Sequence, residues 1–177
     1  QKVRSDYFEA LKSHAAKSSE YVCDKMPHNY VLIGLIKYLF PEGKIIYCKR
    51  DPIDNCFSLY SHKFTELSHQ YSYNQNMLAQ YYKLHVELMN FWIDQYKENI
   101  FILDNEELVN NQESVSRKLI DFCELEWESK CLEFYKTTRQ VRTASIEQVR
   151  QPMNKKSIGA WKRYENHLQE LVSSLHE

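Results

Sequence analysis

The residues best suited to chemistry stand where a predicted strand gives way to a helix. Residues 45–48 (Ile-Ile-Tyr-Cys) are a short apolar run typical of a buried parallel strand. Soon after it, Asp51-Pro52 predicts a helix start, because Asp caps helices and Pro suits the first helical position. Arg50 then leaves the carboxyl end of a strand, and Ser58 lies about two turns into the helix. Open α/β sheets bind ligands at such strand ends, and a guanidinium beside a hydroxyl suits an anion.

Two other segments add polar groups to this pair. Lys25 stands in Asp24-Lys25-Met26-Pro27, directly after a short apolar run at residues 21–23. Residues 137–156 have little apolar periodicity and form a long irregular loop, of the kind that is usually functional or disordered. This loop has a single acid, Glu147, against five basic residues: Arg139, Arg142, Arg150, Lys155 and Lys156.

Each feature also has a simpler interpretation. Arg50 could pair with Asp51 or Asp54 and merely cap a sheet. Lys25 taken alone is typical of a surface ion pair, and the loop could be a solvated basic linker.

Taken together, the three segments resemble the sulfotransferase family. Three motifs occur in the same order as in the family. They are Asp-Lys-Met-Pro, then Arg-Asp-Pro-x-Asp with a Ser eight residues after the Arg, and then Thr-Ala-Ser-x-x-Gln-Val-Arg-x-Pro followed by Gly-Ala-Trp. The similarity covers residues 20–170 and is closest to bacterial tetratricopeptide-linked sulfotransferases, with tyrosylprotein sulfotransferases as more distant relatives. Relatives commonly carry a Tyr at the position of Asn105, and tyrosylprotein sulfotransferases have basic residues at the positions of His62 and Ala160.

The resemblance implies transfer of a sulfuryl group from 3′-phosphoadenosine 5′-phosphosulfate to an acceptor hydroxyl, without a metal. It implies catalytic roles for Lys25, near the bridging oxygen, and for Ser145. It also implies that one set of residues binds the cofactor, whose product is 3′,5′-bisphosphoadenosine: Arg50, Ser58, Gln148, Val149, Arg150, Pro152 and Asn154. Such chemistry resembles phosphoryl transfer, in which catalysis is mostly positioning and electrostatics.

One part of the family pattern is missing from the sequence. The glycine-rich loop that cradles the 5′-phosphosulfate at a helix N-terminus does not occur, and the chain has only three glycines. We therefore expect an N-terminally incomplete sulfotransferase domain over residues 1–177 that is inactive or weak by itself. Its exposed sheet edge would offer a homodimer contact.

Two rival functions remain open at this point. One is a non-catalytic nucleotide-binding or protein-interaction module with the same fold. The other is a nucleotide-dependent phosphotransferase. The sequence supports it less well than the first rival, because no Walker-type lysine loop or magnesium carboxylate set occurs. The class of the hydroxyl-bearing acceptor cannot be read from the sequence.

Bulk properties exclude several classes. The net charge of −1 gives no basic footprint for nucleic acid, and no apolar run approaches the ~20 residues of a membrane span. The five cysteines are scattered and form no Cys-x-x-Cys pair, so we expect neither a zinc site nor a disulfide framework. A reducing, cytoplasmic location is the simplest expectation.

The pattern of elements predicts an α/β fold of P-loop-like type, with three or so parallel strands flanked by many helices. Strands are expected at 21–23, 45–48 and 100–103, the first two joined by a helix over 30–40 as a right-handed βαβ unit. The longest helix is expected at 76–96, with one apolar stripe facing the core: Met77, Tyr81, Leu84, Leu88, Phe91 and Gln95. Other helices are expected over 4–17, from 52, from 104, and over 112–123, 132–135 and 168–175.

Overall fold

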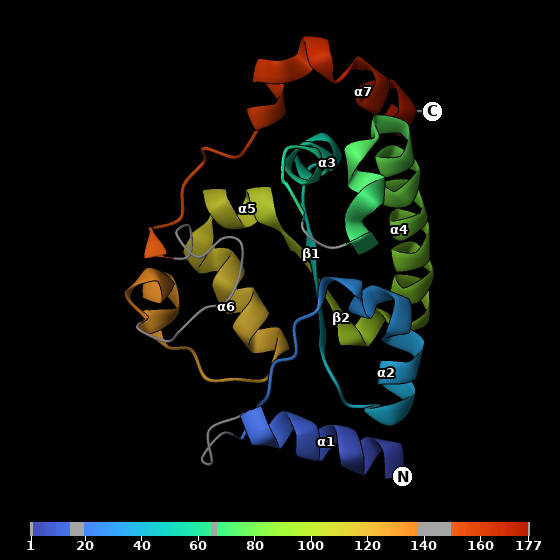
Figure 1. The fold of residues 1–177 in the computed structure, drawn as a ribbon. Coiled ribbons are helices and arrows are strands. Elements are labelled where there is room, and N and C mark those ends of the chain that lie inside the picture. Colours follow the sequence, from blue (N-terminus) through green and yellow to red (C-terminus); the bar gives the residue numbers. More distant parts are fainter. Residues whose placement is uncertain (1, 15–19, 65–66, 138–149, 177) are drawn as a thin grey trace. The chain divides into compact units, whose positions relative to one another are not determined.

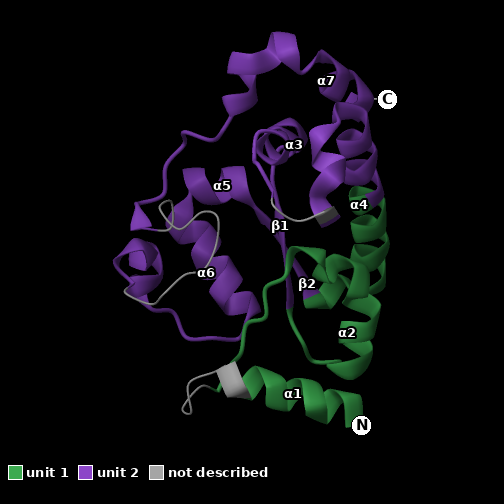
Figure 2. Ribbon diagram, in the orientation of Figure 1, with its two compact units in different colours: residues 1–44, 85–99 green, residues 45–84, 100–177 purple. Residues whose placement is uncertain are grey.

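The structure, a computed structural model of the chain, describes residues 2–14, 20–64, 67–137 and 150–176. They divide into two compact units, residues 1–44 with 85–99 and residues 45–84 with 100–177 (Figure 2). We call these unit 1 and unit 2 and describe each by itself. The expected single domain over residues 1–177 stays a prediction.

Unit 2 holds a two-stranded parallel sheet, in which β1 (Ile45–Lys49) lies beside β2 (Ile100–Asp104) (Figure 1). The register pairs Ile45 with Ile100 and Lys49 with Asp104, so both strands end at the same level. Parallel neighbours need a long crossover, and the chain between these strands contains helices. The α/β fold with a short parallel sheet is therefore confirmed.

The remaining elements of unit 2 are helices that flank this sheet. They are α3 (Pro52–Tyr60), the 3₁₀ helix η2 (Leu67–Tyr73), the first part of α4 (Gln75–Gln95), α5 (Asn105–Asn110), α6 (Gln112–Phe122), the 3₁₀ helices η4 (Ser129–Lys136) and η6 (Ala160–His167), and α7 (Gln169–His176). Most match predicted helices within a few residues.

The core of unit 2 lies where α3, α4 and α7 meet. Five side chains form its buried centre: Cys56, Leu78, Ala79, Leu168 and Leu171. Gln75 links α4 to the C-terminal helices, because its Nε2 donates to the His167 carbonyl at 2.8 Å and its Oε1 accepts from the Leu171 amide at 2.9 Å. The C-terminal segment is thus anchored to the start of α4, which packs with α3 in the same buried core.

Unit 1 contains α1 (Lys2–His14), the 3₁₀ helix η1 (Pro27–Leu32), α2 (Ile33–Leu39), the second part of α4 and the 3₁₀ turn η3 (Lys97–Asn99). Gly34 allows α2 and α4 to approach closely, since a Cβ there would lie 2.7 Å from the Trp92 ring. Among the described residues, no helix is both long and apolar enough to cross a membrane. The cytoplasmic location stays a prediction.

Two expectations about elements are wrong. Residues 21–23 form no strand, and the side chains of Tyr21 and Val22 are 65% and 41% exposed. A three-residue run becomes a strand only where a neighbour pairs with its backbone, and the described chain gives it none. The βαβ unit that was expected to begin there is therefore not formed by these residues.

The second error concerns the face of α4. The helix is present, but Met77, Leu84 and Phe91 of the expected core stripe are more than half exposed. Leu78, Ala79 and Met89 are buried instead. Apolar side chains surround much of this helix, so the periodicity identifies a helix but does not decide which face is covered.

Candidate functional site

The candidate site lies where the two parallel strands end and their helices begin. Arg50 follows β1 directly, and Asn105 follows β2 at the same level of the sheet. Asp51 caps α3, because its Oδ1 accepts from the Asp54 amide at 2.8 Å. Asp104 caps α5 in the same way, from the Glu107 amide at 2.9 Å. The carboxyl end of the sheet thus presents two capped helix starts side by side.

A side chain of α5 connects these two starts. Glu106 Oε1 accepts from the Asp51 amide at 3.2 Å. Burial is the main cause that raises the pKa of Tyr82, to about 12. Electrostatic interactions add smaller upward shifts, in decreasing order from Tyr47, Cys56, Asp51 and Glu106. Tyr82 therefore stays neutral at physiological pH and serves as packing rather than as a charged ligand.

A pocket of about 290 Å³ opens at this end of the sheet. Its walls come from α3, from the start of α5 and from the chain just before and within η6: Arg50, Asp54, Phe57, Ser58, Ser61, Asn105, Ser157 and Ala160. Arg50 and Ser58, eight residues apart in the sequence, line the same pocket, as the strand-then-helix pattern requires. Their role in binding a cofactor stays a prediction.

The guanidinium of Arg50 has one nitrogen that is hydrogen-bonded and one that has no partner among the described residues. Its Nη2 donates to the Ser157 carbonyl at 2.8 Å. Its Nε is buried and has no hydrogen-bond partner among the residues that the structure describes. The Arg50 side chain lines the pocket, and a carboxylate or phosphate is the partner that its planar fork prefers.

The ion-pair alternative for Arg50 is not what the structure shows. Asp51 accepts from the α3 backbone, as described above. Asp54 is 1% exposed and accepts from the amides of Gly159 at 2.5 Å and Trp161 at 3.2 Å. Both carboxylates are therefore engaged by backbone amides, which leaves the Arg50 guanidinium to the pocket and to the Ser157 carbonyl.

Hydroxyl groups of α3 lie along the same wall. Ser58 is exposed, and Ser61 donates from its Oγ to the Ser58 carbonyl at 3.3 Å. Residues three apart on a helix share a face, so both hydroxyls line the pocket. Of these two hydroxyls, that of Ser61 already donates to the Ser58 carbonyl, so the Ser58 hydroxyl is the one that joins Arg50 as a donor suited to a phosphate oxygen.

The other predicted residues have different positions. Lys25 is exposed in unit 1, so its placement toward the pocket stays a prediction. Ser145, Gln148 and Val149 lie outside the described residues. Arg150, Pro152 and Asn154 are described and exposed, in unit 2, and they do not line the pocket. Asn154 instead accepts from the Lys156 amide at 3.1 Å, within its own loop.

Sequence reasoning did not assign Asp54, Ser61, Asn105 or Ser157 to the site. Two of them carried a usable signal, because Asp54 and Ser61 stand four residues before and three after Ser58 on one helix face. Asn105 is the counterpart of Arg50 after the neighbouring strand, which the two strand patterns would have shown. Nothing in the sequence placed Ser157, since its contact with Arg50 joins residues 107 positions apart.

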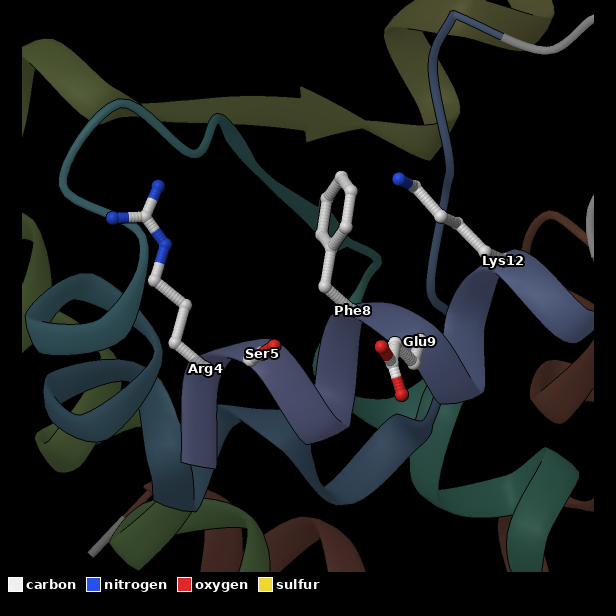
Figure 3. Close-up of a pocket in the computed structure, with 5 residues that line it drawn as sticks. All are labelled: Arg4, Ser5, Phe8, Glu9 and Lys12. Carbon is white, nitrogen blue, oxygen red and sulfur yellow. The ribbon is translucent and has the colours of Figure 1, made fainter. Parts of the chain in front are cut away.

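A larger hollow, of about 380 Å³, lies along α1 and contains none of the predicted residues. Its lining is Arg4, Ser5, Phe8, Glu9 and Lys12, and Figure 3 shows the side chains of Arg4, Phe8 and Lys12 projecting from the same side of the helix. The charged groups rest on aromatic rings, with Lys12 Nζ 4.7 Å from the centre of Phe8 and Arg4 Cζ 5.5 Å from that of Phe40. Arg4 and Lys12 therefore pack against aromatic rings, and these contacts explain their positions without a ligand.

No cluster of three or more His, Cys, Asp or Glu side chains that could hold a metal ion occurs among the described residues. The geometry defines an α/β protein with a pocket lined by Arg50 and Ser58 at the carboxyl ends of two parallel strands.

Comparison with known proteins identifies the family. The model of the sulfotransferase family matches residues 1–129, which include Lys25, Arg50 and Ser58. The chain therefore belongs to the sulfotransferase family. A protein of Aquifex aeolicus (strain VF5), named only as an uncharacterized protein, is 36% identical over 158 residues. That similarity covers 88% of this chain and 21% of the relative, so the chain spans about a fifth of the relative's length.

Proposed function

We propose that this chain binds the 3′-phosphate of 3′-phosphoadenosine 5′-phosphosulfate, and that the protein transfers the sulfuryl group to an acceptor hydroxyl. One observation carries the proposal: Arg50, whose buried Nε has no partner among the described residues, lines the same pocket as Ser58. Family membership supports sulfuryl transfer in general. The choice of donor depends on the pocket.

The residues present fit a phosphate group. A buried donor without a partner costs about 1–3 kcal/mol, and a phosphate oxygen would remove that cost with a charge-assisted bond. The pocket of about 290 Å³ is roughly ten times the ~30 Å³ share of one water molecule, so a phosphate with its attached sugar can enter. The wall contributes the hydroxyls of Ser58 and Ser61 and the side-chain amide of Asn105.

In this proposal each residue has a distinct task. When bound, the donor supplies the sulfuryl group and a phosphate leaving group. Arg50 and Ser58 hold the far phosphate and so distinguish the donor from ordinary adenine nucleotides. Lys25 provides a compact positive charge for the negative charge that develops on the leaving oxygen, and Ser145 assists at the transferred group.

Within the loop, Gln148, Val149, Arg150, Pro152 and Asn154 would cover the bound nucleotide. The acceptor is a hydroxyl-bearing molecule whose class the pocket does not specify. The homodimer contact expected at the sheet edge stays a separate prediction.

Calorimetric titration tests the assignment of the phosphate site. The chain is titrated with 3′,5′-bisphosphoadenosine and with adenosine 5′-monophosphate, and we expect tighter binding of the bisphosphate. Arg50→Ala should reduce that preference about 10- to 100-fold, the equivalent of losing ~1.5–3 kcal/mol of charged hydrogen bonding. Arg50→Lys keeps the charge without the Nε donor and should recover only a small part of it.

Arg163→Ala is the matched control, because Arg163 is an exposed arginine of the same unit outside the pocket wall. It should bind both nucleotides like the unaltered chain. Equal affinity for the two nucleotides, or a preference that survives Arg50→Ala, would refute the proposal and favour a non-catalytic module with this fold.

A further inference from the structure

The pocket is closed on one side by a short stretch of chain that comes from far along the sequence. Residues 157–161, which we call the closing segment, contribute Ser157 and Ala160 to the pocket wall. The closing segment precedes and enters η6, and it reaches α3 through contacts between residues more than 100 positions apart. Some side chain of α3 must therefore hold it in place.

Asp54 makes the larger share of these contacts. Its Oδ2 accepts from the Gly159 amide at 2.5 Å, and its Oδ1 accepts from the Trp161 amide at 3.2 Å. Each carboxylate oxygen thus binds a different amide, and the side chain is 1% exposed. Hydrogen bonds from backbone amides to a buried carboxylate are charge-assisted and stronger than neutral ones.

The backbone of the closing segment is shaped for this contact. Gly159 has φ +68°, in the left-handed region that side chains with a Cβ adopt at a cost. A Cβ built at Gly159 would meet its nearest neighbour, Lys162, only at 3.7 Å, so the requirement for glycine comes from the backbone rather than from lack of space. This turn presents the amides of Gly159 and Trp161 to the same carboxyl group.

The closing segment also touches Arg50. The Ser157 carbonyl accepts from Nη2, two residues before the first amide that Asp54 holds. Because a guanidinium is planar and rigid, a bond at Nη2 restricts the direction in which Nε donates. Within the described part of the chain, Nε is the donor of Arg50 that has no partner.

We propose that Asp54 is a positioning residue for the phosphate site. By holding the closing segment, it keeps the Ser157 carbonyl against Arg50 and so orients the guanidinium with Nε left for a phosphate oxygen. The inference rests on the proposed function, since it concerns the same pocket. It assigns Asp54 no contact with the phosphate, because both of its oxygens are occupied by amides.

The contact itself can be tested without any nucleotide. Amide hydrogen exchange is measured at Gly159 and Trp161 in the unaltered chain and in Asp54→Asn. The Asn side chain replaces one acceptor oxygen by a donor, so we expect exchange at these two amides to become at least about 10-fold faster. Asp121→Asn, on the exposed face of α6, is the control and should leave both amides unchanged.

The effect on the phosphate site is then measured by calorimetry. Asp54→Asn should lose about 10-fold of the preference for 3′,5′-bisphosphoadenosine over adenosine 5′-monophosphate, with the affinity for the monophosphate unchanged. In the Asp54→Asn background, Arg50→Ala should cause a smaller further loss than it does alone. A merely structural defect would weaken both nucleotides together and would leave the two substitutions additive.

A second variant covers the case in which Asp54→Asn does not fold. Gly159→Ala strains the closing segment and leaves the carboxylate in place, and it should lower the same preference. A wild-type preference in either folded variant, or unchanged exchange at both amides in Asp54→Asn, would overturn the inference. Absence of any preference in the unaltered chain would instead show that the proposed function has failed, and the inference would fall with it.

Discussion

The guanidinium of Arg50 has two environments within one side chain. Nη2 is satisfied by the Ser157 carbonyl, whereas the buried Nε has no partner in residues 2–14, 20–64, 67–137 and 150–176. An unpartnered donor of this kind destabilises the folded chain by about 1–3 kcal/mol unless something binds it. A side chain that served only to cap the sheet would gain nothing from this arrangement, so the geometry favours a ligand.

The cysteines of the chain differ sharply at the residue scale, which gives a simple chemical test. Cys56 is fully buried, and burial followed by the charge of Asp51 raises the pKa of its thiol to about 12. Cys23 and Cys48 are exposed. Since the thiolate is the reactive form, we expect iodoacetamide at pH 8 to label the two exposed cysteines and to spare Cys56 until the chain is unfolded.

Peptide mass spectrometry measures the labelling of each cysteine over time. Labelling in urea supplies the reference, in which all three should react at similar rates. Modification of Cys56 as fast as that of Cys48 in the folded chain would contradict the packing of α3 against α4 and α7.

Some residues of the site could be predicted from the sequence and others could not. Arg50 and Ser58 were found because both lie in one local strand-then-helix pattern. Ser157 was missed because its position depends on a long-range contact that no local pattern encodes. Lys25 and Ser145 stay predictions, the first in unit 1 and the second outside the described residues.

At the scale of elements, the two helix caps at the end of the sheet should both stabilise the walls of the pocket, because they fix the starts of α3 and α5. Asp51 and Asp104 each accept from an amide in the first turn of their helices. Loss of such a cap costs about 0.5–2 kcal/mol. We expect Asp51→Ala to lower the free energy of unfolding by about 1 kcal/mol in urea titrations and also to weaken the bisphosphate preference, because α3 carries Ser58 and Asp54.

Asp51→Asn is the matched control, since Asn caps helices about as well as Asp. It should keep most of the stability and of the preference. A loss in Asp51→Asn equal to that in Asp51→Ala would mean that the charge of Asp51 matters and not its cap.

The elements show where pattern reasoning succeeds. The start of α3 was predicted because capping by Asp51 and Pro52 is local chemistry, and β2 because an apolar run of strand-forming residues is bounded by polar ones. The strand at 21–23 failed because pairing requires a partner that the run itself cannot specify. The buried face of α4 failed because the choice among its apolar stripes depends on which elements pack against it.

The chain belongs to the sulfotransferase family and is much shorter than the relative that it matches. It spans about a fifth of the Aquifex aeolicus protein, and its described residues form two units. The family match ends at residue 129, whereas the closing segment lies beyond it. The pocket thus joins residues inside the matched region to residues outside it, and its shape depends on the folding of unit 2 as a whole.

Alkaline unfolding tests this dependence on the packing of unit 2. Burial raises the folded-state pKa of Tyr71 and of Tyr82 from 10.0 to about 12. A raised pKa means that the stability linked to the neutral hydroxyl is fully present below pH 10 and is lost as the pH rises through about 12. We expect the free energy of unfolding, from urea titrations followed by circular dichroism, to fall across this interval. Tyr82→Phe should make this decrease in the free energy of unfolding smaller by about 1 kcal/mol, an amount reduced by solvent screening of a half-buried group.

Tyr38→Phe is the control, because it removes a hydroxyl that is mostly in water: Tyr38 is 81% exposed. It should leave the decrease in the free energy of unfolding unchanged. The same fall in Tyr82→Phe as in the unaltered chain would show that this hydroxyl ionises as freely in the folded chain as in the unfolded one, and that its surroundings are not packed as described.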